Sequence, residues 1–145
     1  MRILVDGDSC PVLDIISHIA KKNNIELLVF TDLNHQHQLE YAKIITVDQG
    51  FQSVDMRLYN QIKADDIIIT SDYGLAALAL SEQTAVISFS GREFTNNNIE
   101  RLLAHRHRQF KERRRTARHT SHKKRSEKDD LRFKNKLLEI IKRFR

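Results

Sequence analysis

Apolar residues follow two patterns along the chain: short continuous runs, and longer stretches in which they recur with helical spacing. The continuous runs predict buried strands at residues 2–6, 25–31, 43–47, 66–70 and 84–90. The periodic stretches predict amphipathic helices at residues 11–24, 53–64, 72–83, 95–106 and 126–145. Continuous apolar strands are typical of parallel sheets that are covered on both faces. We therefore expect an α/β fold, a three-layer sandwich with a mostly parallel central sheet.

Length and composition favour one soluble domain. The chain has 145 residues, of which 40% are hydrophobic, enough for a single domain with its own core. No apolar run approaches the roughly 20 residues that span a bilayer, and the start lacks the pattern of a signal peptide. A lone cysteine, Cys10, cannot form an internal disulfide. We expect a cytoplasmic protein without a membrane partner.

Charge divides the chain into three parts within this single domain. Residues 1–104, the predicted α/β body, hold 8 Lys and Arg against 14 Asp and Glu. Residues 105–125 hold 10 Lys and Arg against a single Glu and form a basic segment. Residues 126–145 form an amphipathic helix with a net charge of +3. A concentrated basic segment on an acidic body suggests a polyanionic partner.

The basic segment is predicted to contact nucleic acid, with RNA preferred over DNA. The alternative is that these charged side chains contact only solvent. Because nearly all of the charges are positive, we favour contact with phosphates, with an affinity that falls steeply as the salt concentration rises. The segment is expected to be either flexible or an exposed extension of a helix, and it lacks the interleaved aromatics that stack on bases. The residues expected to bind phosphates are Arg113, Arg114, Arg115, Arg118, Lys123, Lys124 and Arg125.

The last helix carries an apolar stripe that needs a surface to cover it. Ser126 and Asp129 form a predicted N-terminal cap. The stripe consists of Leu131, Leu137, Leu138, Ile141 and Phe144. We expect the stripe to pack either on the body or on a second copy of the chain, as a homodimer.

Four aspartates are predicted to meet at one edge of the sheet. Asp6 ends the first strand and Asp8 follows it, Asp72 follows the strand 66–70, and Asp55 lies in the first turn of a helix. Carboxyl ends of parallel strands share one edge, where ligands bind. Clustered carboxylates repel one another, and Mg²⁺ or Mn²⁺, which prefer oxygen ligands, would offset that repulsion.

We therefore assign catalytic roles to all four aspartates. Asp6, Asp8 and Asp72 are expected to hold the metal, and Asp55 to hold it or to orient water. Thr70 and Ser71 are expected to support the site by a hydrogen bond to a ligand or to a carboxylate.

Capping of helices is the alternative explanation for these acids. Asp8, Ser9 or Cys10 would then cap the first helix, and Asp72 would cap the helix after the strand 66–70. For Cys10 we favour a packing or capping role over that of a nucleophile, because the nearby aspartates oppose a thiolate. Asp65 and Asp66 precede a strand, so we expect them at the opposite edge as solvated turn residues.

Three stretches carry a resemblance to a known family. "VDGDSCP" near the start, "VD" at 54–55 and "DDIIITSDYGLA" at 65–76 resemble the YaiI/YqxD family of uncharacterised bacterial proteins. The resemblance covers residues 2–104 and continues loosely into the last helix. This family is similar to PIN-like domains, many of which are metal-dependent ribonucleases.

The resemblance implies roles for particular acids. Asp6, Asp55 and Asp72 fill the positions at which PIN-like enzymes place acids, and Asp8 is an addition. The sequence departs from the pattern in having Asp55 where PIN nucleases commonly use Glu, and in lacking a clear later acid beyond Asp72. The resemblance thus implies the fold more firmly than the activity.

Three functions are consistent with these residues. The first is a divalent-metal-dependent phosphodiesterase, similar to a ribonuclease, that acts on nucleic acid. The second is a PIN-like module that binds nucleic acid without cutting it. The third is a haloacid-dehalogenase-type phosphatase with Asp6 as nucleophile and Asp8 as acid/base, which ranks lowest because no lysine follows Asp72 until after residue 105.

Overall fold

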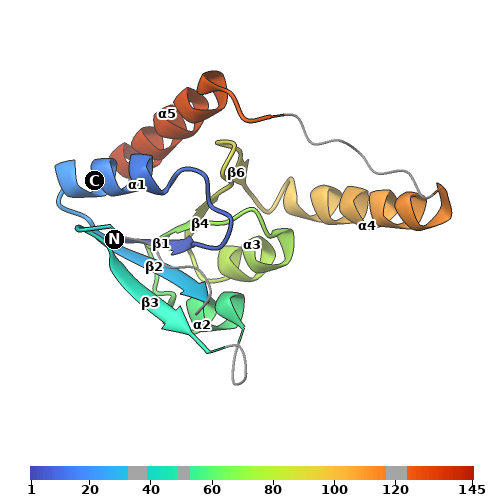
Figure 1. Cartoon of the computed structure of the whole chain (residues 1–145), viewed down its shortest axis with the longest axis horizontal. Coiled ribbons are helices and arrows are strands. Elements are labelled where there is room, and N and C mark those ends of the chain that lie inside the picture. The colour runs from blue at the N-terminus through green and yellow to red at the C-terminus, as the bar shows by residue number, and fades with distance from the viewer. Residues whose placement is uncertain (33–38, 49–52, 117–123) are drawn as a thin grey trace.

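The computed structural model describes residues 1–32, 39–48, 53–116 and 124–145, with the backbone alone for 113–116. Six strands and five helices occur in these residues (Figure 1). Along the chain they are β1 (Arg2–Asp6), α1 (Leu13–Lys22), β2 (Glu26–Asp32), β3 (Lys43–Val47), α2 (Val54–Gln61), β4 (Ile67–Ile69), α3 (Tyr73–Leu80), β5 (Ala85–Ile87), β6 (Glu93–Phe94), α4 (Ile99–Thr116) and α5 (Glu127–Phe144). Each predicted strand and helix is present, and the two-residue strand β6 was not predicted.

The six strands form one sheet in the order β3-β2-β1-β4-β5-β6. Every neighbouring pair is parallel except β5 and β6, which are antiparallel. The predicted α/β fold with a mostly parallel central sheet is therefore confirmed. The chain order reverses between β1 and β4, and in open α/β sheets ligands bind outside the carboxyl ends of the strands at such a reversal.

Helices cover both faces of the sheet, which gives the expected three layers. Ile3 and Val5 of β1 belong to a core cluster that includes residues of α1 and α5. Leu4, between them, belongs to a second cluster that includes residues of α2, α3 and the first turns of α4. This alternation follows from the two-residue period of a strand. Because both faces are buried, β1 has to be apolar throughout its middle.

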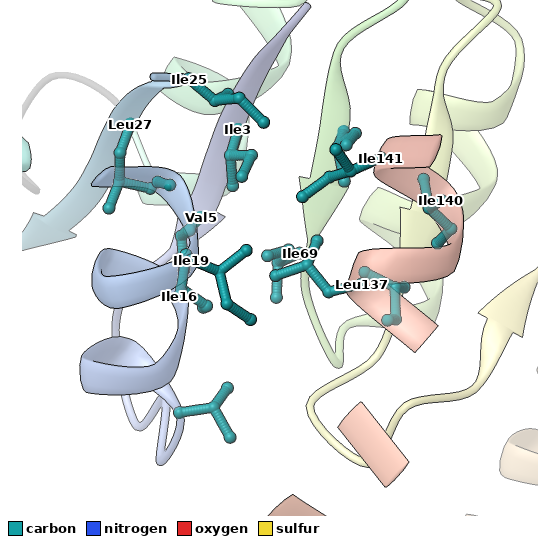
Figure 2. Close-up of a cluster of buried hydrophobic side chains, with 14 of the residues drawn as sticks. Ile3, Val5, Ile16, Ile19, Ile25, Leu27, Ile69, Leu137, Ile140 and Ile141 are labelled. Carbon is teal, nitrogen blue, oxygen red and sulfur yellow. The ribbon is translucent and has the colours of Figure 1, made fainter. Parts of the chain in front are cut away.

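The last helix, α5, packs on the sheet of its own chain. Phe133, Leu137, Ile140 and Ile141 are buried in the cluster on the α1 face, and Figure 2 shows Leu137 beside Ile69. Of the predicted stripe, Leu137 and Ile141 are in the core, whereas Leu131 is 56% exposed. The buried part of the stripe packs on the body of its own chain, as the first of the two alternatives states.

The start of α5 is fixed to the turn between β5 and β6. The side chain of Arg125 donates to Phe89 O at 2.7 Å and to Asp130 Oδ1 at 2.6 Å. Gly91, with φ +87°, lies so close that a Cβ there would come within 2.9 Å of the backbone of Arg132. The predicted cap is present, since Ser126 N donates to Asp129 Oδ2 at 2.9 Å.

The helix α4 begins later and ends later than predicted. It runs from Ile99 to Thr116, across the boundary that we placed after residue 104. Its side chains from 104 to 112 are exposed, and Figure 1 shows the helix projecting away from the sheet. For residues 105–116 the predicted helical extension is thus correct, and 117–123 lie outside the described residues. No helix in the described ranges is long and apolar enough to cross a membrane.

Asp66 is a buried structural residue, contrary to our prediction of a solvated turn. It is 1% exposed, and its carboxylate accepts bonds from Arg2 Nη2 at 2.6 Å, Arg2 Nε at 3.1 Å and Lys63 N at 2.8 Å. Arg2 Nη2 also donates to Gln61 O at 2.8 Å. This ion pair joins the start of β1 to the start of β4. Both charges are largely removed from water, so each depends on the other for compensation. The neighbouring Asp65 is exposed, as expected.

Replacing Asp66 by Asn is expected to lower the free energy of unfolding by about 2–4 kcal/mol. The amide of Asn would place an N–H group opposite the N–H donors of Arg2 and Lys63, and Arg2 would lose its counter-charge. Urea unfolding measures this change. Asp65→Asn is the matched control, with an expected change below about 0.5 kcal/mol. Equal losses in the two variants would show that the Arg2–Asp66 pair does not stabilise the fold.

Candidate functional site

Thr70 joins the ends of β1 and β4 through one buried hydroxyl. Its Oγ1 donates to Asp6 Oδ2 at 3.0 Å and accepts from the backbone N of Asp72 at 3.1 Å. The side chain of Thr70 is fully buried, so a single orientation of the hydroxyl serves both bonds. The predicted hydrogen bond from Thr70 to a carboxylate is therefore present in the structure, and it connects two of the predicted acids.

Asp8 is held by the end of β2. Its Oδ1 accepts from Thr31 Oγ1 at 2.9 Å and from Asp32 N at 3.3 Å. Helix α1 begins after Val12 without a side-chain cap, so the capping alternative is wrong for Asp8. Nothing in the sequence identifies Thr31 as the partner of Asp8, because threonine is common in strands.

Gly7 sets the path of the chain between the two aspartates. Its backbone N donates to Phe30 O at 2.7 Å. A Cβ at this position would lie 2.7 Å from Val29 Cγ1 and 2.9 Å from Phe30 O, closer than a side chain tolerates. Only glycine therefore lets the chain pass against β2 between Asp6 and Asp8.

Asp72 caps helix α3, as the capping alternative states. Its Oδ1 accepts from Gly74 N at 2.8 Å and from Leu75 N at 3.2 Å. Arg106 Nη1 of α4 lies 3.8 Å from the same oxygen. Capping fixes the orientation of the Asp72 carboxylate, so it does not exclude a second role for this residue. Arg106 was not among the predicted site residues.

The charges of the other three predicted acids act on Asp6 at this edge of the sheet. The pKa of Asp6 is raised to about 6, first because burial disfavours its charged form. The bond from Thr70 opposes this rise in pKa, and the negative charges of Asp8, Asp72 and Asp55 add to it. The side chains thus share one electrostatic environment although they come from separate segments. A bound cation would relieve the repulsion among them.

The donor atoms suit a hard divalent ion with few protein ligands. Within residues 1–32, 39–48, 53–116 and 124–145, no three or more His, Cys, Asp and Glu side chains form a group that could hold a metal ion. Mg²⁺ commonly keeps several waters and takes only about one or two carboxylates from the protein. Asp6, Asp8 and Asp72 each have a carboxylate oriented by a protein donor, as ligands of metal ions commonly do.

The two supporting residues next to these acids have structural partners. Ser71 Oγ accepts from Phe89 N at 3.3 Å, which ties the end of β4 to the turn after β5. Cys10 is half-buried against the core cluster of α1. Burial raises the pKa of its thiol to about 12, so Cys10 is protonated at neutral pH and is poorly suited to act as a nucleophile.

The predicted phosphate-binding residues lie at or beyond the end of α4. Arg113, Arg114 and Arg115 are in its last turns, where only the backbone is described. Arg118 and Lys123 lie outside the described residues. Lys124 is exposed, and Arg125 is engaged by Phe89 and Asp130 as described above.

Comparison with known proteins gives consistent matches over nearly the whole chain. The family profile described as "Uncharacterized BCR, YaiI/YqxD family" matches residues 4–143. A UPF0178 protein of Natranaerobius thermophilus is 48% identical over 141 residues, which cover 97% of this chain and 96% of the relative. A UPF0178 protein of Clostridium novyi is 42% identical, with coverage of 97% and 95%.

Among solved structures, the crystal structure of Rae1 (YacP) from Bacillus subtilis, a W164L mutant, is similar to this chain. The TM-score is 0.47 and the sequence identity is 15%. The match covers 81% of this chain and 84% of the other.

Replacing Asp6 by Asn is expected to stabilise the metal-free protein at neutral pH. The pKa of Asp6 in the folded state is raised from its ordinary value of 3.8 to about 6, so its protonated form favours folding. This stabilisation is complete below pH 3.8 and is lost as pH rises through about 6. Asn stays neutral and keeps an acceptor for Thr70. Between pH 4 and pH 7.5 the variant should therefore gain about 2 kcal/mol in free energy of unfolding relative to the wild type.

Urea unfolding in EDTA at several pH values measures this difference, with Asp65→Asn as the control that should follow the wild type. A difference between Asp6→Asn and wild type that does not change with pH would mean that Asp6 is not in a repulsive environment. A variant that is less stable at pH 7.5 would identify Asp6 as a purely structural residue.

Proposed function

The chain belongs to the YaiI/YqxD family, and we propose that it is a divalent-metal-dependent phosphodiesterase that cleaves RNA. The observation that carries this proposal is the hydroxyl of Thr70, which links Asp6 and Asp72 at the point where the order of the strands reverses. This arrangement supports a site that faces ligands at the carboxyl ends of β1 and β4. The raised pKa of Asp6 supports a need for positive charge there.

Each acid has a distinct part in the proposed reaction. Asp6, with Asp8 or Asp72, would hold Mg²⁺ or Mn²⁺, which when bound activates water and offsets charge on a phosphoryl oxygen. Asp55, in the first turn of α2, would hold the metal as well or orient the attacking water. Thr70 holds Asp6 in one orientation, so that the carboxylate is already in place when the substrate arrives.

The helix α4 supplies the attraction for a polyanion. Arg106, Arg108 and Lys111 are exposed along it, and the predicted phosphate-binding arginines follow them. A basic helix that projects from an acidic body attracts a phosphate backbone in a salt-dependent way. The choice of RNA rests on the resemblance of the family to PIN-like domains, and it agrees with the cytoplasmic location expected from the single cysteine.

A module that binds nucleic acid without cutting it is the second candidate function. The role of Asp72 as the cap of α3 favours it, because that role explains this acid without a metal. In this case the basic helix would bind nucleic acid and the aspartates would be structural.

Cleavage of a labelled single-stranded RNA in the presence of Mn²⁺ tests the proposal. Asp6→Asn and Asp72→Asn should each lower the rate at least about 100-fold, because loss of even an outer-shell partner of a metal ligand costs about 10–100-fold. Asn also caps helices well, so α3 stays intact in Asp72→Asn. Asp65→Asn, at the opposite edge of the sheet, is the control and should cleave at the wild-type rate.

Two results would refute the phosphodiesterase. RNA binding without metal-dependent cleavage, lost when the arginines and lysines of 105–125 are neutralised, would establish the binding module. Hydrolysis of a generic phosphomonoester in preference to RNA, dependent on Asp6, would instead establish the phosphatase.

A further inference from the structure

A cavity of about 490 Å³ lies beside the acidic edge of the sheet. Three parts of the chain form its walls: Ser71 and Tyr73 at the start of α3, Ser88 and Arg92 around the turn after β5, and His105 and Arg106 on α4. Its volume is within the roughly 300–1,000 Å³ that is typical of sites for small ligands. None of these residues was predicted to bind a ligand except Ser71.

The lining of the cavity suits an anion. Arg92 and Arg106 contribute two guanidinium groups, and His105 adds a ring that donates through nitrogen. No acidic side chain occurs among the described residues that line it, although the body as a whole is acidic. Arginine is well suited to phosphate, because its planar fork of donors matches two phosphate oxygens at once.

The wall formed by the β5–β6 turn is held in place by hydrogen bonds. Ser88 N donates to Arg92 O at 2.8 Å, and Arg92 N donates to Ser88 Oγ at 3.0 Å. The hydroxyls of Ser88 and Ser90 lie 2.9 Å apart. Ser71 Oγ accepts from Phe89 N at 3.3 Å, so this turn is also tied to the end of β4. A ligand would therefore meet a wall whose backbone is already ordered.

Arg106 connects the cavity to the acidic edge. Its Nη1 is 3.8 Å from Asp72 Oδ1, and the two side chains are 61% and 42% exposed. An exposed pair at this distance is weak, so the guanidinium can turn to a phosphate at little cost. Ser71 stands between Thr70 and Asp72 in the sequence, which places the cavity directly beside the two acids that Thr70 links.

An aromatic ring gives the cavity a second kind of contact. Tyr73 is half-buried and packs edge to face on Phe94, with the ring centroids 5.5 Å apart. Both rings line the cavity. Aromatic faces stack on bases of any sequence, so the cavity combines contacts for a phosphate and for a base.

We infer that this cavity binds one nucleotide of a nucleic-acid strand, with its phosphate held by Arg92 and Arg106 and its base against Tyr73. The inference rests on the proposed function for the identity of the strand, because a bound nucleotide here adjoins the edge where the phosphodiester would be cut. The basic helix α4 attracts the strand over a long distance, and the cavity fixes its position.

Binding of a fluorescein-labelled uridine octamer, followed by fluorescence anisotropy, tests this inference. The full chain carries Asp6→Asn and is kept in EDTA, so that cleavage does not interfere. Arg92→Gln and Arg106→Gln should each weaken binding about tenfold, as expected for loss of a bond to a charged group. Arg101→Gln is the matched control, an exposed arginine on α4 outside the cavity lining, and should weaken binding less than about twofold.

Competition experiments distinguish a nucleotide from a simple anion. Uridine monophosphate should displace part of the octamer from the protein with both cavity arginines intact, and should lose this effect in Arg92→Gln. Tyr73→Leu should weaken binding of the monophosphate and leave competition by inorganic phosphate unchanged. Competition by inorganic phosphate as strong as by uridine monophosphate would contradict a nucleotide site.

The outcomes separate this inference from the proposed function. If the cavity variants bind like Arg101→Gln, the inference is overturned, even where Asp6→Asn abolishes cleavage. If the cavity variants lose binding and no metal supports cleavage, the cavity inference stands and the phosphodiesterase fails. Melting temperatures within about 2 °C of the parent show that the variants are folded.

Discussion

The arrangement of the site depends on one buried hydroxyl, that of Thr70. It donates to Asp6 at the end of β1 and accepts from the backbone of Asp72 at the start of α3. Thr70 and Asp6 are 64 residues apart in the sequence, and they meet because β1 and β4 are neighbours at the reversal of strand order. The position of Asp6, the beginning of α3 and the adjoining wall of the cavity all follow from this contact.

This contact brings together negative charges that oppose folding, and the rest of the molecule offsets that cost. Burial and three neighbouring carboxylates raise the pKa of Asp6, which lowers stability at neutral pH. Two apolar clusters, one on each face of the sheet, supply the opposing free energy. The helix α5 is part of one of them, so a segment far from the acids in sequence helps to keep them together. Proteins commonly accept such a cost at a functional site.

Sequence reasoning succeeded where a local pattern has one physical solution. Continuous apolar runs such as 66–70 have to be buried strands, and strand order then places Asp6 and Asp72 at one edge. It failed where tertiary contacts decide: Asp66 is buried by its pair with Arg2, and Phe133 faces the core in place of Leu131. Nothing in the sequence indicated the cavity either, because Arg92 and Arg106 line one cavity only through the turn after β5 and the direction of α4.

The most direct test of the account is calorimetric titration of the metal-free protein with Mn²⁺ at pH 6, in two buffers of different ionisation enthalpy. Because the pKa of Asp6 is about 6, binding should release about half a proton per ion at that pH and almost none at pH 7.5. Asp6→Asn should bind more weakly and release none. Binding with equal affinity and proton release in wild type and Asp6→Asn, or no binding by the wild type, would contradict the claim that these acids jointly hold a divalent ion.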